Sequence, residues 1–539
     1  MSHRTNPRNE VRTVSELLDR VYASHAAEHA LRWGERWLSF DEVAGLAAGM
    51  ARELLDSGAA PGDRVVVYLE NSVLARLVDH ALLGFGFVRV ALSSRLHPRE
   101  VAAIVDDAQA AIVCVAGSRE RGVRDALNER GSVVPVLDLG NDDAILTRFY
   151  GATAGGETRV YSGPGDIAML MYSSGTTGAP KGVVVTHSAW LAQTEHALSH
   201  LPLIGPQDVV VLGAPMPHFG GSVALDCAMR GARTVVVEPF DASRVLDAVE
   251  RHGGTVLPLV PTLLARLVDA LPGREESVAT VRSVPYGGSP APVDVLARAA
   301  RCFPGALTQF YGLAEALAPL TVLTPDDHDR AARDLAEHPH RADVARTRLQ
   351  SAGRWIPEIE HRDDDGVLKI RGPVVMPGYW RRDELTASVL NDGWFSTGDI
   401  GCTDDAGYLH IFGRRSDLII SGGFNIHPRE VEQVIEEIDG IAEVAVVGLA
   451  DERWGEGVHA FAVLEASASV PISRDELARL VREACLARIA SYKKPVGVHV
   501  VDALPRNSFG KVDRAALREA FRPESTTDPQ NPTNEMENP

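Results

Sequence analysis

One stretch of the chain combines the residue types that hold a polyphosphate. It runs Tyr172-Ser173-Ser174-Gly175-Thr176-Thr177-Gly178-Ala179-Pro180-Lys181-Gly182. Glycines let backbone N–H groups approach an anion closely, the hydroxyl groups donate hydrogen bonds, and Lys181 adds a positive charge. A flexible linker is the alternative, but linkers rarely carry this combination directly behind an apolar run such as Ile167 to Met171. The stretch is not a Walker loop, because that pattern ends Gly-Lys-Ser/Thr and here Ala179-Pro180 precedes Lys181.

The elements that must position this stretch alternate between strands and helices. Before it, we expect strands at 64–69, 87–92 and 111–115, and helices at 41–55, at 72–83 and from Pro98. After it, we expect a helix over 183–198, strands at 209–212, 234–237 and 255–257, and helices at 242–251, 262–271 and 292–302. Such alternation predicts an α/β fold whose parallel strands are joined by right-handed crossovers.

The remainder of the chain, from Gly353 on, has a different pattern of expected strands and helices. From Gly353 to Gly413, short β-rich pieces with Gly and Asp turns predict a small barrel-like subdomain. An amphipathic helix then begins at Pro428, followed by strands at 442–449 and 460–464 and a helix over 474–488. Residues 1–9 are expected to be frayed, 151–165 to form a loop, and the polar tail from Pro523 to be disordered.

Composition limits the class of protein. The 539 residues exceed the usual length of one domain, and 45% hydrophobic with 24% charged residues is typical of a globular protein. The formal net charge of −19 argues against nucleic acid or an anionic membrane as the main partner. The five cysteines lack Cys-x-x-Cys spacing, which fits neither a zinc site nor a disulfide framework and favours a reducing cytosol. Because no signal peptide or long apolar segment is apparent, we expect a cytoplasmic protein without a membrane span.

Five segments occur in the order found in the acyl-adenylate-forming superfamily, which the chain resembles from about Val14 to Arg514. Besides the phosphate-binding stretch they are Tyr311-Gly312-Leu313-Ala314-Glu315, Gly393-Trp394-Phe395-Ser396-Thr397-Gly398-Asp399, Gly413-Arg414-Arg415-Ser416-Asp417 and Pro505-Arg506-Asn507-Ser508-Phe509-Gly510-Lys511. The superfamily contains acyl-CoA synthetases, adenylation domains of peptide synthetases and luciferases, and the chain is most similar to free-standing acid–CoA ligases.

The resemblance implies a domain organisation and a two-step reaction. A large N-terminal domain of layered αβ sheets and the small subdomain would occupy residues 1–413, and 414–417 would be a hinge. A small mobile α+β C-terminal domain would cover 418–522, with a disordered tail at 523–539. The first step makes acyl-AMP and pyrophosphate from ATP and a carboxylic acid, and the second passes the acyl group to a thiol or an amine.

The resemblance also implies roles for single residues, chiefly around ATP. The residues that would bind ATP or AMP are Ser173, Ser174, Gly175, Thr176, Thr177, Gly178, Lys181, Gly287, Gly288, Gln309, Phe310, Tyr311, Gly312, Asp399, Arg414 and Lys511. Among them Tyr311 would pack on adenine, and Asp399 would accept both ribose hydroxyls with its two oxygens. Lys511 would reach the bond-forming oxygens as a catalytic residue, and Glu315, the second catalytic residue, would ligate Mg²⁺. Taken singly, Lys511 would be an ordinary surface lysine and Asp399 an Asx turn.

Some positions depart from the family pattern. Ala314 stands where many members carry Thr, so a hydroxyl contact to the α-phosphate is expected to be missing, at a cost of about 0.5–1.5 kcal/mol. Ser416 replaces the Asp or Lys common at the hinge, and a small residue there still permits rotation. Ile420 replaces a lysine that some members place near acyl-AMP. Gly422-Gly423 resembles the lining of a pantetheine tunnel, although an ordinary turn is an equal alternative.

The acid substrate is expected to contact Pro215-Met216-Pro217-His218-Phe219-Gly220-Gly221, which resembles one wall of the family's acyl pocket. His218 matches a histidine that orients the carboxylate and is the third predicted catalytic residue, with a packed core histidine as the alternative. The predicted substrate-binding residues are His218, Phe219, Gly220, Tyr286, Gly288 and Leu317. Phe219 cannot pair with an α-ammonium, so an α-amino acid is disfavoured and an aryl or medium-chain fatty acid is expected.

Three functional classes remain open at the level of sequence. The first is an acid–CoA ligase that uses ATP, Mg²⁺ and CoA. The second makes the same acyl-AMP but delivers it to a carrier-protein thiol or to an amine. The third is a non-catalytic nucleotide-binding protein, which the presence of Lys181, Glu315, Asp399 and Lys511 disfavours.

Overall fold

A computed structural model describes residues 11–149, 162–173, 180–364, 366–451, 453–464, 473–507 and 511–521. The chain divides into two compact units, Met1–Ile411 and Phe412–Pro539, and each is described by itself. The predicted frayed N-terminus, most of the 151–165 loop, the middle of the phosphate-binding stretch and the predicted disordered tail lie outside the described residues. Within the described part, no helix has both the length and the apolarity needed to cross a bilayer.

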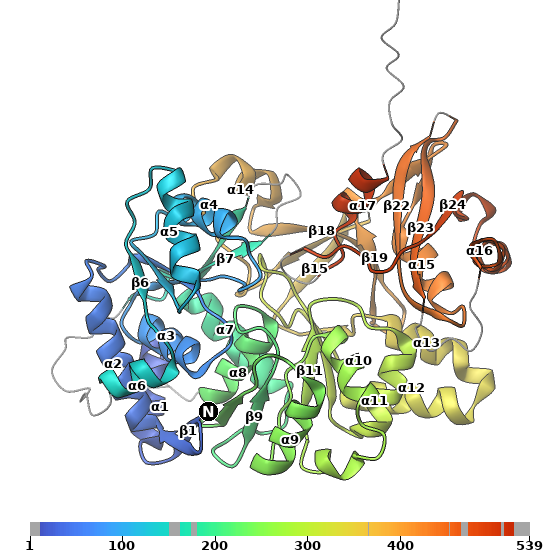
Figure 1. Cartoon of the computed structure of the whole chain (residues 1–539). Helices are drawn as coiled ribbons and strands as arrows, with labels where there is room; N and C mark the ends of the chain where they lie inside the picture. Colours follow the sequence, from blue (N-terminus) through green and yellow to red (C-terminus); the bar gives the residue numbers. More distant parts are fainter. Residues whose placement is uncertain are drawn as a thin grey trace, which may run out of the picture. The chain divides into compact units, whose positions relative to one another are not determined.

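A six-stranded sheet in the order β6-β5-β3-β4-β7-β8 carries the phosphate-binding stretch. Its strands are β3 (Arg64–Tyr68), β4 (Val88–Ala91), β5 (Ile112–Val115), β6 (Val136–Asp138), β7 (Ile167–Ser173) and β8 (Lys181–Thr186). All neighbours are parallel except β7 and β8, which are antiparallel. Alternate residues of β3 face opposite cores. Val65 and Val67 pack with α2 (Phe40–Asp56) and α3 (Val73–Gly84), whereas Val66 and Tyr68 pack with α4 (Pro98–Ala108) and α5 (Arg119–Glu129) (Figure 1).

A second sheet, in the order β2-β1-β10-β9, shares the first sheet's inner helical layer. Its strands are β1 (His29–Trp33), β2 (Arg36–Ser39), β9 (Val209–Leu212) and β10 (Arg233–Val236). Val210 and Leu212 join the core that contains α2, α3, α7 (His187–Ser199) and α8 (Phe219–Ala228). Val209 and Val211 face the other way, toward α9 (Ala242–His252), α10 (Pro261–Asp269) and α11 (Val293–Cys302). The first unit is therefore layered, with helices between and outside two sheets.

Two further sheets complete the first unit. One has the order β11-β12-β13-β14, with β11 (Val284–Gly287), β12 (Leu307–Tyr311), β13 (Thr321–Leu323) and β14 (Arg354–Trp355). The other has the order β15-β16-β18-β17, with β19 (Leu409–Arg414) on β18, and forms the predicted small β-rich subdomain. Its remaining strands are β15 (Glu360–Asp364), β16 (Val367–Arg371), β17 (Leu390–Asn391) and β18 (Trp394–Thr403), with α14 (Asp383–Val389) beside β17.

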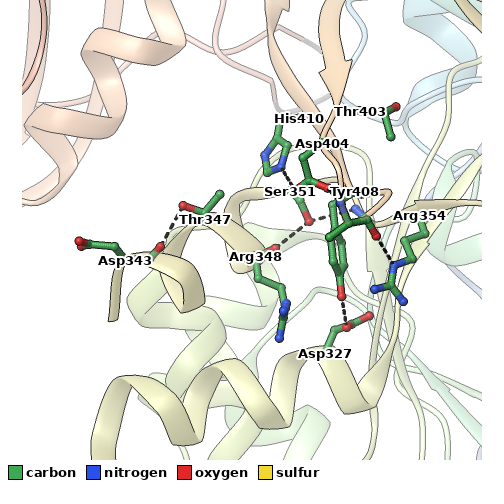
Figure 2. A network of polar contacts seen from close by, with 12 residues as sticks. Asp327, Asp343, Thr347, Arg348, Ser351, Arg354, Thr403, Asp404, Tyr408 and His410 are labelled. Atoms are coloured by element: carbon green, nitrogen blue, oxygen red, sulfur yellow. Dashed lines mark hydrogen bonds and ion pairs between the residues drawn. The ribbon is translucent and has the colours of Figure 1, made fainter. Parts of the chain in front are cut away.

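A polar network joins this subdomain to the layered part. Figure 2 shows the Tyr408 side chain pointing toward Asp327 on α12 (Pro325–Glu337), and its hydroxyl donates to Asp327 Oδ1 at 2.5 Å. Asp404 accepts from the Tyr408 backbone N–H at 2.9 Å, and its Oδ2 lies 3.0 Å from His410 Nε2. The Arg354 guanidinium lies over the Tyr408 ring, 4.3 Å from its centroid. These contacts tie β19 to α12 within the first unit.

The second unit is an α+β fold around a sheet in the order β21-β20-β23-β22, with β24 beside β23. Its elements are β20 (Ile419–Ser421), β21 (Phe424–Ile426), α15 (Pro428–Glu436), β22 (Ile441–Asp451), β23 (Gly455–Leu464), α16 (Arg474–Arg488), β24 (Gly497–Val500) and α17 (Arg514–Ala520). Helices α15 and α16 pack on one face of the sheet and α17 contacts the other, as the separate cores around Val446 and Val447 indicate. The predicted mixed α/β class with a smaller α+β part is confirmed.

The expected helix over 183–198 is wrong in its first part. Residues 181–186 form β8, and α7 begins at His187 with Thr186 as its N-cap. Three consecutive valines, Val183 to Val185, favour a strand because β-branched side chains pack well on a pleated surface. The expected strand at 255–257 is reduced to isolated bridges of Val256 with Val210 and Ser283.

Asp208 connects three segments that run beside β9. Its carboxylate accepts from Arg282 at 2.9 and 2.7 Å, from Thr255 Oγ1 at 2.8 Å and from the Gly205 N–H at 3.0 Å, and the side chain is fully buried. Burial raises the pKa of Asp208, but these partners outweigh it and leave the pKa below its ordinary value.

We expect Asp208→Ala to destabilise the first unit by about 1–3 kcal/mol, because Thr255 and Gly205 lose a buried acceptor. Arg282 is partly exposed and can rehydrate, which keeps the cost below that of a fully buried pair. The matched control is Asp247→Ala, which removes an exposed partner of Arg274. Urea unfolding followed by tryptophan fluorescence should show a lower midpoint only for Asp208→Ala. Equal midpoints for the two variants would contradict the connecting role.

Candidate active site

The phosphate-binding stretch is the connection of an antiparallel hairpin. Ser173 at the end of β7 pairs with Lys181 at the start of β8. Ser174, Gly175, Thr176, Thr177 and Gly178 lie outside the described residues. Gly182 next to Lys181 allows a close approach of Tyr172, since a Cβ there would lie 3.0 Å from Tyr172 Cζ. The hairpin register therefore determines where Lys181 leaves the sheet.

Lys181 meets two residues from distant parts of the first unit. Its Nζ donates to Glu315 Oε1 at 2.9 Å and to the Tyr379 hydroxyl at 2.8 Å, and lies 4.3 Å from the centroid of the Tyr379 ring. The Tyr379 hydroxyl in turn donates to Glu315 Oε1 at 2.9 Å. Burial raises the pKa of Glu315, but the charge of Lys181 and the two hydrogen bonds outweigh it, so the pKa lies below its ordinary value. The carboxylate is held ionised beside the loop.

Backbone hydrogen bonds bring these three residues together. Glu315 follows β12, and its carbonyl accepts from the Met376 N–H at 2.9 Å. Tyr379 is tied to β8 on both sides, since the Gly378 carbonyl accepts from Val184 N–H and Trp380 N–H donates to the Gly182 carbonyl. The cluster of Lys181, Glu315 and Tyr379 is thus built on backbone pairing.

Asp399 and Tyr311 form a second part of the site. The Tyr311 hydroxyl donates to Asp399 Oδ2 at 2.5 Å, joining β12 to β18. The Asp399 N–H donates to Thr397 Oγ1 at 3.0 Å, and that hydroxyl donates to the Leu368 carbonyl at 2.9 Å. Asp399 is 5% exposed, and the Tyr311 hydroxyl orients its carboxylate. The two residues that the sequence predicts to contact adenine and ribose are therefore in direct contact.

The predicted nucleotide residues on β11 and β12 lie close to this pair. A Cβ at Gly287 would lie 2.4 Å from the Phe310 carbonyl oxygen, and one at Gly312 would lie 2.6 Å from Ala318, so both positions need glycine for packing. Gly288 has φ +92° and open space around its missing Cβ. The Gln309 side-chain amide is engaged within the protein, since its Oε1 accepts from Tyr286 and its Nε2 donates to the Ser351 carbonyl.

The predicted acid wall begins helix α8. His218 is the N-cap residue, and Phe219 and Gly220 form the first turn. The Phe219 ring meets Phe310 of β12 edge-on, with centroids 6.1 Å apart. Leu317, also predicted to line the acid pocket, is 7% exposed and belongs to the central core. The wall therefore abuts the strand that carries the nucleotide candidates.

Tyr286, predicted to line the acid pocket, lies in the core of the first unit. Its side chain is fully buried, and its hydroxyl donates to Gln309 Oε1 at 2.9 Å and lies 2.7 Å from His328 Nε2. A residue that lines an open pocket retains some exposed surface, so this geometry supports a positioning role for Tyr286 through Gln309. Neither partner of its hydroxyl was visible in the sequence, because Gln309 lies on β12 and His328 on α12.

Three predicted residues belong to the second unit. Arg414 ends β19, and Ser416 lies in a short 3₁₀ turn, Arg415–Asp417. The Lys511 N–H donates to Asn507 Oδ1 at 3.1 Å, and the Asn507 N–H donates to the Lys511 carbonyl at 2.8 Å. These bonds join Asn507 to Lys511, and Ser508 to Gly510 lie outside the described residues.

Ion pairs hold the loop of Lys511 on both sides. Arg506 pairs with Glu443 at 2.7 Å, and Arg514 pairs with Glu432 at 2.5 Å. Arg514 also lies 3.9 Å from Asp417 in the 3₁₀ turn at 415–417, the predicted hinge. The segment that follows Lys511 and this turn are therefore connected within the second unit.

Tyr379 is a site residue that sequence reasoning missed. The stretch Met376-Pro377-Gly378-Tyr379-Trp380 carries an aromatic pair after a turn signal, which could have drawn attention. Its partner Lys181 is 198 positions away, so spacing alone could not have joined them.

Comparisons with known proteins show which family the chain matches. Residues 18–380 match the AMP-binding enzyme family, and residues 430–511 match the AMP-binding enzyme C-terminal domain. The long-chain-fatty-acid–CoA ligase FadD13 of Mycobacterium tuberculosis is 32% identical over 496 residues, covering 90% of this chain and 93% of that protein. The 2-succinylbenzoate–CoA ligase of Bacillus velezensis is 32% identical over 493 residues, covering 91% and 94%. The structure of the amide bond synthetase McbA from Marinactinospora thermotolerans has a TM-score of 0.81 at 30% identity and covers 95% of this chain and 100% of that one.

The ion pair of Lys181 and Glu315 predicts a pH-dependent defect in Lys181→Met. Without the lysine, burial of Glu315 acts against fewer opposing contacts, so the pKa of the carboxyl should rise above its unfolded value. A raised carboxyl pKa contributes stability at low pH and loses it as pH rises through that pKa. We therefore expect the stability deficit of Lys181→Met, relative to wild type, to be larger at pH 7.5 than at about pH 5.

Thermal unfolding across this pH range measures the deficit. The control is Glu315→Gln added to Lys181→Met, which removes the titrating group and should abolish the pH dependence. A deficit that stays constant with pH in Lys181→Met would show that the lysine does not control the ionisation of Glu315.

Proposed function

Because the chain belongs to the AMP-binding enzyme family, we propose that it is an ATP-dependent, AMP-forming acid–CoA ligase. It joins a carboxylic acid to the α-phosphate of ATP with release of pyrophosphate, and then transfers the acyl group from AMP to the thiol of CoA. The observation that carries the proposal is the Lys181, Glu315 and Tyr379 cluster at the mouth of the phosphate-binding hairpin.

The cluster addresses the main barrier of the first step. A carboxylate and a triphosphate repel each other, so cationic and hydrogen-bonding groups must offset the charge that builds up on the departing pyrophosphate. Lys181 brings a cation to the hairpin mouth, and Glu315 and Tyr379 hold its Nζ in one place. Asp399, oriented by Tyr311, would accept the ribose hydroxyls and so place the α-phosphate relative to the acid wall.

The residues also fit magnesium. Mg²⁺ is usually bound through one or two carboxylates together with substrate phosphates, and a dedicated cage of protein ligands is uncommon. Among the described residues there is no group of three or more His, Cys, Asp and Glu side chains that could form such a cage. Glu315, ionised beside the phosphate loop, is the residue that would hold the ion. When bound, Mg²⁺ would neutralise phosphate charge.

The acyl acceptor is inferred from the relatives of the chain, and the class of acid is inferred from apolar residues of the predicted acid pocket. The curated relatives that transfer to CoA support a CoA thiol as the acceptor. The alternative is an amine or a carrier-protein thiol, and the similarity to an amide bond synthetase favours an amine within that alternative. For the acid, the apolar Phe219 and Leu317 support an aryl or medium-chain fatty acid.

An acid panel tests the function directly. We would assay ATP–pyrophosphate exchange with aryl and medium-chain acids, then incubate the best acids with ATP and either CoA or amines, and identify products by mass spectrometry. Acid-dependent exchange with an acyl-CoA product is expected. Exchange with amide products alone would select the alternative acceptor, and no exchange with any acid would reject the function.

The contact between Tyr311 and Asp399 predicts a defect in nucleotide binding. Tyr311→Phe removes the hydroxyl that orients Asp399, and loss of one such bond to a charged group should raise the KM for ATP roughly tenfold. Asp399→Ala should raise it further, with little change in acid affinity. Tyr408→Phe is the matched control, because it removes a tyrosine–aspartate bond of the same length, 2.5 Å, in the same unit. An unchanged KM for ATP in Tyr311→Phe and Asp399→Ala would reject the ribose assignment.

Lys511 is predicted to act in the first half-reaction only. Lys511→Ala should slow acyl-AMP formation by roughly 100- to 1000-fold, since it removes a cation facing developing phosphate charge. Acyl transfer from chemically prepared acyl-AMP should remain close to normal in the same variant. Arg479→Ala, which removes an exposed cation of α16, is the control and should leave both steps unchanged. Single-turnover kinetics separates the steps, and equal loss of both in Lys511→Ala would contradict the assignment.

A further inference from the structure

The acid wall is a tightly folded segment, Ala214 to Gly221. It follows β9 and ends inside the first turn of α8. The His218 N–H donates to the Pro215 carbonyl at 3.3 Å, which folds the segment back on itself. A Cβ at Gly221 would lie 2.0 Å from the Met216 carbonyl oxygen, and one at Gly220 would lie 2.4 Å from the Ala214 Cβ. The segment thus has little freedom to change its internal shape, but it could still shift as one piece.

One end of the segment is clamped by Asn71. The Asn71 Nδ2 donates to the Ala214 carbonyl at 2.8 Å, and the Asn71 Oδ1 accepts from the Met216 N–H at 2.9 Å. Both polar atoms of one side chain therefore bind the main chain of the wall. Asn71 directly precedes Ser72, the N-cap residue of α3, so the N-terminus of that helix holds its position.

The other end is held by Arg76, which lies on α3 one helical turn beyond Ser72. Its Nη2 donates to the Gly221 carbonyl at 3.2 Å, and its Nη1 lies 3.4 Å from Asp79 Oδ2. Arg76 and Asp79 are each 2% exposed. Asp79 also accepts from Arg89 Nε at 2.5 Å.

A buried ion cluster of this kind contributes little net stability, because desolvation of the charges offsets their attraction. It does, however, orient the Arg76 guanidinium, since Asp79 holds its Nη1 and the Gly221 carbonyl holds its Nη2. Asp226 on α8, the helix that the wall begins, attracts the Arg76 charge and accepts hydrogen bonds from Gln193 and Thr194 of α7. The cluster therefore ties α3 to the helix that carries the acid wall.

The position of the wall matters because Phe219 projects from it toward the nucleotide strands. A Cβ at Gly287 of β11 would lie 3.3 Å from Phe219 Cε2, and Phe219 meets Phe310 of β12 edge-on. Because Phe219 packs against these strands, a shift of the segment would move the Phe219 ring relative to the nucleotide residues and so change the wall that an acid would meet.

We propose that Asn71 and Arg76 are positioning residues that set the acid specificity of the enzyme by fixing the wall at residues 214–221. This proposal rests on the function proposed above. It adds two residues to the candidate site, Asn71 just before α3 and Arg76 on α3. Neither residue need touch the acid. Their effect is transmitted through the carbonyl and N–H groups of Ala214, Met216 and Gly221.

Two variants test the proposal, and each has a matched control. Asn71→Ala removes the first clamp, and Ser72→Ala removes the neighbouring N-cap of α3 without touching the wall. Arg76→Lys keeps the buried charge but cannot reproduce the planar fork that reaches both Gly221 and Asp79. Arg89→Lys loses a bond to the same Asp79 but has no contact with the wall among the described hydrogen bonds. Thermal unfolding of all four variants establishes that they are folded.

ATP–pyrophosphate exchange over an acid panel supplies the readout. We expect Asn71→Ala and Arg76→Lys to raise the KM for the preferred acid roughly three- to tenfold, as the loss of one or two hydrogen bonds at the wall implies. Discrimination between the preferred acid and one that is a methylene longer should also fall. The KM for ATP should stay within about twofold of wild type, since the strands that carry the nucleotide residues keep their own partners. Ser72→Ala and Arg89→Lys should lower thermal stability without changing the ranking of acids.

An unchanged acid ranking in both Asn71→Ala and Arg76→Lys would overturn the proposal. So would equal changes in the two controls, because general loosening of α3 would then explain the effect. If wild-type enzyme shows no acid-dependent exchange with any acid, the proposed function itself is overturned, and this inference falls with it. The wild-type result thus separates failure of the function from failure of the clamp.

Discussion

The antiparallel pairing of β8 with β7 is the constraint on which the candidate site depends. Side chains alternate between the two faces of a strand, so a slip of one residue would turn Lys181 to the opposite face. The observed register pairs Ser173 with Lys181 and Tyr172 with Gly182. Gly182 permits that register, because the Tyr172 ring occupies the space where a Cβ would be. The strand register thus fixes the position of Lys181, and Glu315 and Tyr379 accept hydrogen bonds from its Nζ there.

Much of the architecture could be read from the sequence, because it depends on local patterns. The alternation of apolar strands with capped helices predicts the α/β layers, and α16 occupies the residues expected for it. The segment 183–186 was misassigned as helix because its valines lie next to helix-forming residues. Its strand conformation depends on pairing with β7, which precedes it in the chain. Sequence periodicity also could not place α3 between two sheets, since Arg76 and Asp79 have the spacing of a solvent-facing polar stripe and yet are buried.

The candidate site shows the same division between local and distant information. Four of the predicted residues stand in recognisable segments, and the structure forms two pairs from them within the first unit. Lys181 contacts Glu315, and Tyr311 contacts Asp399. Tyr379, Asn71 and Arg76 carry no local signal of their roles, because each acts on a partner more than a hundred positions away. The full burial of Tyr286 likewise results from packing. Apolar neighbours in the sequence are found both in pocket walls and in cores, so they do not show which of the two a residue belongs to.

The ion pairs beside Lys511 have a mechanical consequence for the second unit. Arg514 links Glu432 of α15 to Asp417 in the hinge turn, and Arg506 fastens the other side of the lysine loop to Glu443 of β22. These ion pairs connect the segments on both sides of Lys511 to α15, to β22 and to the 3₁₀ turn that contains Ser416. A change of the backbone angles at Ser416 would therefore have to carry the backbone of Lys511 along with α15 and β22, because the ion pairs hold these elements together.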